Sequence, residues 1–220
     1  MPTLHVLRVF VNEDGEWGNA LGVFLDGDRI PAEERQLLAA ELGFSETVFV
    51  DDRASGSLRI HTPQVELAFA GHPTVGTAWL LAHEGFPVKT LRPPAGAVGV
   101  RLAGEETHVT ARPEWAPPFE FRQLDTPAEL GRIDAASIGA NTYAWTWIDE
   151  AAGTLRARSF APEVGIAEDE ATGSAAIGLC ALLGRPLVIH QGHGSVLRCR
   201  PLADGLVELG GVSRLVETRG

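Results

Sequence analysis

The chain has 220 residues, of which 45% are apolar and 21% are charged, and its formal net charge is −11. This length fits one large domain or two small domains with a shared interface, and the apolar content is enough for a sizeable core. A chain this acidic lacks the basic surface that attracts nucleic acids and anionic membranes, so we expect neither as a partner.

The first part of the chain reads as strands with one helix among them. The helix follows Pro31, carries acidic residues in its first turn, and ends at Leu42 before Gly43, which suits a left-handed cap. Strand patterns cover residues 4–11, 20–25, 44–50 and 57–62.

Two later segments predict helices that are apolar on nearly every face and are therefore buried. The first covers residues 72–84 and opens with Gly71-His72-Pro73, and the second covers residues 173–184. A shift of 102 residues superposes the two helices, and a shift of 99 superposes the segments before them. The matched pairs are Gly71 with Gly173, Gly76 with Gly178, Leu80 with Leu182, Leu81 with Leu183, Arg59 with Arg158, Pro63 with Pro162, and Val65 with Val164. Together they indicate an internal duplication.

The duplication and a proline-rich stretch at 112–118 divide the chain into two predicted half-domains. We expect one over residues 1–112 and the other over residues 119–220. The predicted fold class is α+β, with two pseudo-symmetric halves that each wrap a curved sheet around a central helix. In the tail we expect strands at 196–200, 205–209 and 212–217, separated at Asp204-Gly205 and Gly210-Gly211, with room for the last strand to return to the first half.

Glu46 is the first candidate for chemistry, because it lies in a strand pattern among apolar residues. The residues that strand alternation places on one face are Phe44, Glu46, Val48 and Val50. Burial on that face would raise the pKa of the Glu46 carboxyl toward the neutral range that a general acid or base needs. From the pattern alone, a glutamate at a sheet edge or bonded to a turn stays the alternative.

Further polar groups stand at the starts of the two buried helices. His72 either contacts a substrate or relays a proton, or it simply caps its helix. The run Glu168-Asp169-Glu170 either contributes to a site or only complements a helix dipole. The N-termini at Gly71 and at Gly173-Ser174 would form an anion site if they face one cleft, and would otherwise be two ordinary helix starts.

Signals for metals, phosphates and reactive thiols are weak. His190-Gln191-Gly192-His193 has two histidines but no acidic third ligand nearby, so we expect no metal site. The sequence contains neither a phosphate-binding loop nor a dinucleotide fingerprint. Cys180 falls in an apolar helix and Cys199 in a strand, and the first segment lacks a secretion pattern, so we expect a cytoplasmic protein with reduced thiols.

Four segments form a recognisable set. They are 18–23 (Gly-Asn-Ala-Leu-Gly-Val), 44–49 (Phe-Ser-Glu-Thr-Val-Phe), 69–76 (Phe-Ala-Gly-His-Pro-Thr-Val-Gly) and 168–175 (Glu-Asp-Glu-Ala-Thr-Gly-Ser-Ala). In this order they resemble the motifs of the PhzF-like phenazine-biosynthesis protein family, which shares the diaminopimelate-epimerase fold. The last two segments are long and specific.

The resemblance implies an active site between two halves, each a barrel around its central helix. It implies that Glu46 is the general acid/base and that His72 and Asp169 lie in the site. The residues that it implies for substrate binding are Asn19, Gly71, Thr172, Gly173 and Ser174. It also implies a small anionic substrate, a homodimer, and no need for a metal or an organic cofactor. The cysteine pair of the related epimerases has no counterpart in the helix-opening motifs.

The chain departs from the family pattern in three places. Glu170 stands where the family usually has proline and would add a charge beside Asp169, and Ala20 also replaces a common proline. Only about 40 residues separate the linker from Arg158, so we expect some usual elements to be missing. We expect an isomerase that moves a proton on a small carboxylated substrate. The alternatives are a non-catalytic binding protein on the same scaffold, and a lyase or hydratase that uses the same proton transfer.

Overall fold

The computed structural model describes residues 2–162 and 166–220, so Val164 of the predicted repeat lies outside the described residues. The α-helices are α1 (Ala32–Leu42), α2 (Gly71–His83), α3 (Pro127–Gly131) and α4 (Gly173–Leu183). The strands are β1 (Leu4–Val11), β2 (Asn19–Phe24), β3 (Glu46–Asp52), β4 (Ser57–His61), β5 (Glu66–Leu67), β6 (Thr90–Leu91), β7 (Val98–Ala103), β8 (Glu106–Ala111), β9 (Glu120–Gln123), β10 (Thr142–Asp149), β11 (Thr154–Ala161), β12 (Ile166–Asp169), β13 (Leu187–Gln191), β14 (Ser195–Pro201) and β15 (Val207–Arg219).

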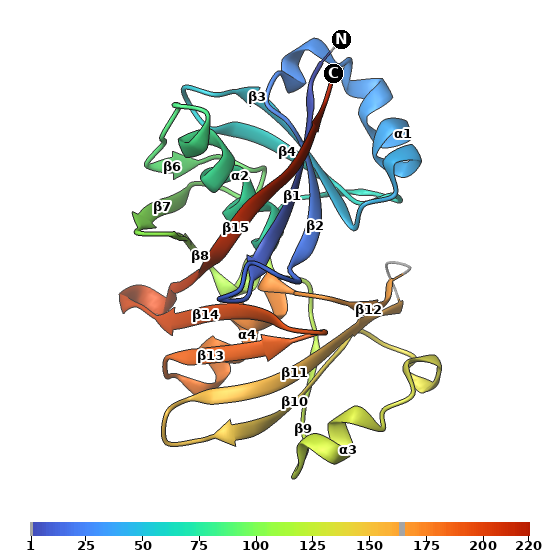
Figure 1. The fold of residues 1–220 in the computed structure, drawn as a ribbon, viewed down its shortest axis with the longest axis vertical. Coiled ribbons are helices and arrows are strands. Elements are labelled where there is room, and N and C mark those ends of the chain that lie inside the picture. Colours follow the sequence, from blue (N-terminus) through green and yellow to red (C-terminus); the bar gives the residue numbers. More distant parts are fainter. Residues whose placement is uncertain (1, 163–165) are drawn as a thin grey trace.

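One mixed sheet runs through the whole molecule (Figure 1). Its main path has the strand order β5-β4-β3-β2-β1-β15-β14-β13-β11-β10-β9; strands β8, β7 and β6 extend in that order from β15, and β12 extends from β11. The succession β2-α1-β3-β4-β5-α2 recurs as β9-α3-β10-β11-β12-α4, and in both the first two strands pair in parallel. The predicted α+β fold with two similar halves is therefore confirmed. Below, residues 2–112 are called the first half and residues 119–220 the second half; their standing as separate domains stays a prediction.

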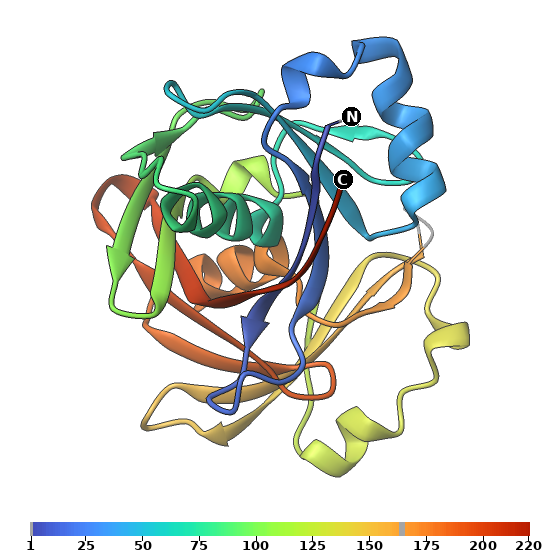
Figure 2. The ribbon, with the colours of Figure 1, turned by 45° about the horizontal axis from the view of Figure 1, so that its top comes forward.

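The helices α2 and α4 lie side by side in the interior, with strands of the sheet curving around them (Figure 2). Their apolar residues fill the main core, as the sequence pattern indicates, because neither helix has a continuous polar face. Both helices also pack against β15. The strand therefore lies against both central helices and belongs to the sheet of both halves.

The outer face of the first half is covered by α1. A separate apolar cluster lies under this helix and contains Phe49 of β3 together with Phe44. The predicted common face of residues 44 to 50 is thus wrong at its first position. The chain is still leaving the left-handed cap at Gly43, and strand geometry begins only at Glu46. Val48 and Val50 do face the main core.

The tail differs from its predicted strands at one point. The pair Gly210-Gly211 does not separate two strands, because β15 continues through it to Arg219. A Cβ on Gly210 would lie 2.1 Å from Nδ1 of His108, and one on Gly211 would lie 2.6 Å from Cδ1 of Phe10. Here the glycines make room for packed rings and form no turn. The strand passes from β14 and β8 to β1, so its last part pairs within the first half.

Candidate active site

Glu46 is the first residue of β3 and points toward the start of α2. Its Oε2 lies 3.4 Å from Nδ1 of His72, and only 13% of its side chain is exposed. Among the described residues this buried oxygen has no hydrogen-bond partner. Burial disfavours the charged carboxylate and raises the pKa of Glu46 to about 7. A carboxyl with such a pKa exchanges protons near neutral pH.

His72 is the second residue of α2 and is 3% exposed. It does not cap the helix with its side chain, since the N-cap residue is Ala70. Burial disfavours the imidazolium and lowers the pKa of His72 to about 4, although the negative charge of Asp169 opposes this change. At neutral pH the ring is therefore neutral, with one nitrogen that donates and one that accepts.

Asp169 ends β12 and is the third ionisable group of the cluster. Nδ2 of Asn19 donates to its Oδ1 at 2.7 Å, and Oγ1 of Thr172 donates to its Oδ2 at 2.6 Å. Burial, followed by the charge of Glu46, raises the pKa of Asp169 to about 6. The two hydrogen bonds favour the ionised form, so Asp169 keeps a negative charge more readily than Glu46 does.

The N-termini of α2 and α4 meet at the same place. A Cβ on Gly71 would lie 2.7 Å from the carbonyl carbon of Gly173, and a Cβ on Gly173 would lie 2.8 Å from the backbone nitrogen of His72. Either contact is too close for a real side chain, so this approach requires glycine in both helices. Ser174 is buried in the first turn of α4. Backbone N–H groups from two helix starts are thus brought together beside the titratable cluster.

Gln191 and Tyr143 form hydrogen bonds that support the cluster. Neither residue was predicted from the sequence to belong to the site. The hydroxyl of Tyr143 and the backbone N–H of Thr172 both donate to Oε1 of Gln191. Its Nε2 donates to the backbone oxygen of Asp169 and to Oγ1 of Thr172. Because that Oγ1 accepts from the amide, its own proton is directed to Asp169. The sequence does contain one indication of this role. Gln191 is polar, although the alternation of β13 places its side chain inward, where an apolar residue is expected.

The other two acidic residues beside Asp169 face away from the cluster. Glu168 pairs with Arg158 at 2.7 Å. Glu170 accepts hydrogen bonds from the backbone of His193 and from Oγ of Ser195. The expectation that Glu170 adds its charge beside Asp169 is therefore corrected: its carboxylate holds the turn between β13 and β14.

The two histidines of the His190–His193 segment do not share a ligand site. His193 pairs with Glu170 and stacks on Trp17, at 5.3 Å between ring centroids. Within residues 2–162 and 166–220, no group of three histidine, cysteine, aspartate or glutamate side chains is placed to hold a metal ion. Over the same residues, no helix has the length and apolar character needed to cross a membrane.

The chain is similar to known proteins in sequence and in fold. The model of the "Phenazine biosynthesis-like protein" family matches residues 8–140. The trans-2,3-dihydro-3-hydroxyanthranilate isomerase of Pseudomonas fluorescens is 30% identical over 81% of this chain and 76% of its own length. "Antisense-enhancing sequence 1" of Schizosaccharomyces pombe is 43% identical, but over only 36% of this chain and 28% of its own length.

Solved structures show the same fold. A phenazine biosynthesis protein of the PhzF family from Enterococcus faecalis has a TM-score of 0.79 at 23% identity, over 99% of this chain and 97% of that one. A hydroxyproline epimerase from Agrobacterium vitis has a TM-score of 0.65 at 11% identity, over 99% of this chain and 91% of that one. The matching family model and the length of the isomerase alignment place the chain: it belongs to the PhzF-like isomerase family.

Proposed function

We propose that this protein is a cofactor-independent isomerase that moves a proton between two carbon atoms of a small carboxylate-bearing substrate. Glu46 acts as the general acid/base. Its carboxylate takes a proton from an activated carbon, and the electron pair of that C–H bond moves into the adjacent unsaturated system. The protonated Glu46 then returns the proton at another carbon of that system, so no atom is gained or lost.

The observation that supports this role most strongly is the environment of Glu46. Its Oε2 is buried without a hydrogen-bond partner among the described residues, and its pKa is raised to about 7. A base with a pKa near the working pH is ionised often enough to take a proton and acidic enough to return it. The carboxyl of Asp169 accepts hydrogen bonds from two donors and stays ionised more readily, so Glu46 alone takes and returns the proton in this proposal.

Asp169 and the neutral His72 orient the substrate in this proposal. The side chain of Asp169 can accept a hydrogen bond from a hydroxyl or ammonium group of the substrate. His72 can donate to an oxygen that gains charge as the proton leaves, because a neutral ring donates without adding a full charge.

The substrate carboxylate binds in this proposal at the paired helix starts. Backbone N–H groups near Gly71, Gly173 and Ser174 are suited to an anion, and the positive ends of two helix dipoles favour it. Asn19 and Thr172 complete the set of substrate-binding residues. The proposal also keeps the homodimer that the family resemblance implies and the cytoplasmic location expected from the cysteines and the first segment.

The substrate class in this proposal is a small cyclic acid with a conjugated double-bond system. One relative is named a trans-2,3-dihydro-3-hydroxyanthranilate isomerase, and the chain aligns with 76% of its length. That compound is therefore the first member of the panel to be tested.

The test is proton exchange measured by NMR in deuterated solvent. We expect the wild-type protein to incorporate deuterium into the substrate at two carbon positions, and Glu46→Gln to lose this activity while it stays folded. The matched control is Glu120→Gln, because Glu120 likewise begins a strand that pairs in parallel but is exposed. Exchange in Glu46→Gln at the wild-type rate would disprove the role of Glu46. A product that has lost or gained water would instead identify a lyase or hydratase, and binding without turnover would identify a binding protein.

A further inference from the structure

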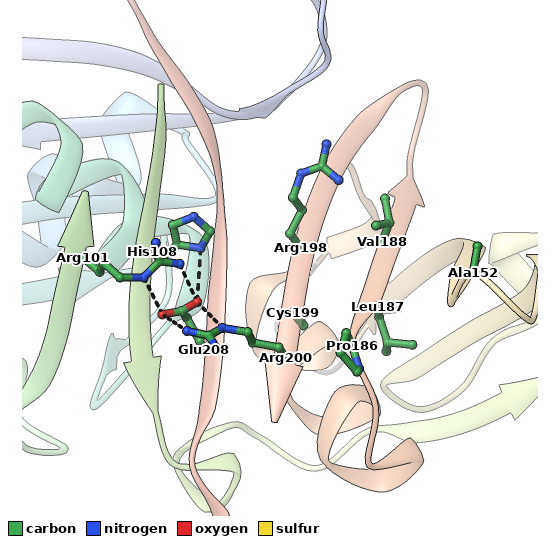
Figure 3. Close-up of a pocket in the computed structure, with 10 residues that line it drawn as sticks. All are labelled: Arg101, His108, Ala152, Pro186, Leu187, Val188, Arg198, Cys199, Arg200 and Glu208. Carbon is green, nitrogen blue, oxygen red and sulfur yellow. Dashed lines mark hydrogen bonds and ion pairs between the residues drawn. The ribbon is translucent and has the colours of Figure 1, made fainter. Parts of the chain in front are cut away.

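A cavity lies on the outer face of the sheet, where the two halves join (Figure 3). Its volume is about 250 Å³, close to the lower end of the range of small-molecule sites, roughly 300–1,000 Å³. Strands β7, β8 and β15 form one side and strands β13 and β14 form the other. Neither the family motifs nor the proposed isomerase function involves the residues that line it.

The charged side of the cavity is built around Glu208. Only 6% of this side chain is exposed. Arg101 donates to the carboxylate through Nε at 2.9 Å and Nη2 at 2.7 Å, and Arg200 donates through Nε at 2.7 Å. The hydrogen bond from Arg101 is the largest cause that lowers the pKa of Glu208 to about 2. Glu208 is therefore ionised at any physiological pH and fixes both guanidinium groups in place.

Arg198 supplies a guanidinium group that is directed away from Glu208 (Figure 3). Its Nε donates to Glu106 at 2.7 Å, and across the described residues its two terminal nitrogens have no hydrogen-bond partner. A guanidinium has five N–H donors, so Arg198 keeps several for a ligand. A planar donor pair of this kind fits a carboxylate with two parallel hydrogen bonds.

The charges of this cavity leave one positive charge uncompensated. Three arginines face two carboxylates, Glu208 and Glu106. Burial lowers the pKa of His108, which keeps its ring from adding a further charge at neutral pH. A local positive excess is opposite in sign to the chain as a whole, whose formal net charge is −11. One negative charge on a ligand would balance the site.

The opposite wall of the cavity is apolar. Pro186 and Val188 supply its surface, beside Leu187, which points into the main core (Figure 3). A ligand that lies between the two walls meets arginine donors at one end and hydrocarbon along its body. This combination favours a carboxylate with an apolar body over an inorganic anion, which would leave the apolar wall in contact with water.

The cavity is separate from the candidate active site, because successive residues of β15 point to opposite faces. Glu208 points outward into the cavity. The next residue, Leu209, points inward, and its Cδ2 would lie 2.8 Å from a Cβ on either Gly71 or Gly173. A molecule in the cavity therefore lies across the sheet from Glu46.

We propose that this cavity binds a small monocarboxylate with an aromatic or branched apolar body. Arg198 donates to the carboxylate, Arg200 adds positive charge from the side of Glu208, and Pro186 and Val188 cover the body. The site is a second ligand site of the protein and does not depend on the proposed isomerase reaction.

The test uses 4-fluorobenzoate as the probe, with fluorine NMR and isothermal titration calorimetry on the full chain. We expect Arg198→Gln to weaken binding at least about tenfold, the usual effect of losing a hydrogen bond to a charged group. Arg200→Gln serves as the second variant and should weaken binding in the same direction. The matched control is Arg214→Gln, because Arg214 is an arginine of similar exposure, 42% against 38%, that pairs with Glu105 and does not line the cavity.

The active site could also bind a carboxylate, so Glu46→Gln is measured in parallel and should leave the affinity for the probe unchanged. The neutral 4-fluorobenzamide should bind at least tenfold more weakly than the acid. The proposal is overturned if neither Arg198→Gln nor Arg200→Gln changes the affinity, if Glu46→Gln alone changes it, if the amide binds as well as the acid, or if the folded wild-type protein does not bind the probe.

Discussion

The carboxyl of Glu46 illustrates how a single buried group connects stability with function. The unfolded chain has a pKa near 4.5 at this position, and burial raises it to about 7 in the folded protein. A raised carboxyl pKa means that the folded state binds the proton more tightly. The resulting stabilisation is fully present below pH 4.5 and is lost as the pH rises through about 7.

We therefore predict that Glu46→Gln is more stable than the wild type at pH 8, by roughly 2–3 kcal/mol in free energy of unfolding. The glutamine amide cannot ionise. Because it carries no charge, it also removes the repulsion between residue 46 and the carboxylate of Asp169. The difference should shrink toward zero near pH 4.5. Thermal melts of both proteins across this pH range measure it, and a difference that does not change with pH would contradict the buried-carboxyl assignment.

Gln191 gives a second prediction at the scale of single residues. Its amide makes the hydroxyl of Thr172 donate to Asp169. In Gln191→Leu that hydroxyl is free to turn, so the charged form of Asp169 is less favoured and its pKa rises. We expect the acidic limb of the pH–rate profile to move to higher pH and the rate at pH 6 to fall roughly tenfold.

The control for this variant is Gln36→Leu. The side-chain amide of Gln36 also makes two hydrogen bonds, from Nε2 to the backbone oxygen of Thr62 and between Oε1 and Nδ1 of His61. Gln36 lies outside the candidate site. An equal shift of the pH profile in both variants would mean that the effect is a general loss of stability.

At the scale of elements, the contact between the starts of α2 and α4 decides whether the candidate site can form. A Cβ on Gly173 would lie 2.8 Å from the backbone nitrogen of His72. Since backbone atoms cannot turn away as a side chain can, the two helices would have to separate. We predict that Gly173→Ala costs about 1–3 kcal/mol of stability, typical of overpacking, and reduces turnover more than tenfold.

Gly131→Ala is the matched control, because Gly131 ends α3 and has open space where its Cβ would lie. Chemical denaturation and substrate turnover are measured for both variants. Wild-type stability and activity in Gly173→Ala would show that the helices tolerate separation and that their close contact is not required.

The elements themselves could largely be predicted from the sequence. Apolar runs opened by Gly71 and Gly173 predicted both central helices, and the four motifs predicted the family and the fold. The errors have local physical causes. Gly210-Gly211 reads as a break, yet the glycines there accommodate the rings of His108 and Phe10.

The support around the candidate site was harder to foresee. Gln191 and Tyr143 lie 48 residues apart, and their hydrogen bond depends on β11, which pairs with β10 on one side and in parallel with β13 on the other. The direction of Glu170 depends on a turn more than 20 residues away along the chain. The sequence could therefore suggest which residues to examine in the site, while the structure supplies the partners that orient them.

At the scale of the whole molecule, the two halves depend on each other through β15. Its first residues pair with β14 and β8, and its last residues pair with β1. We predict that residues 1–112, produced alone, give no cooperative thermal transition, because β1 and β8 each lose a neighbouring strand and α2 loses a packing surface. Addition of residues 119–220 to the same solution should restore a transition. A stable, cooperatively melting first half on its own would contradict the prediction.

The path of β15 also has a consequence for how the chain folds during synthesis. Leu4 pairs with Arg219, so β1 leaves the ribosome long before the residues of β15 that pair with it. Contacts of such long sequence separation make folding slow, because a large loop must close before they form. Until then β1 presents an unpaired edge, which is the kind of edge that joins neighbouring chains. We conclude that the first half is most prone to aggregation during synthesis, before β15 is available to pair with β1.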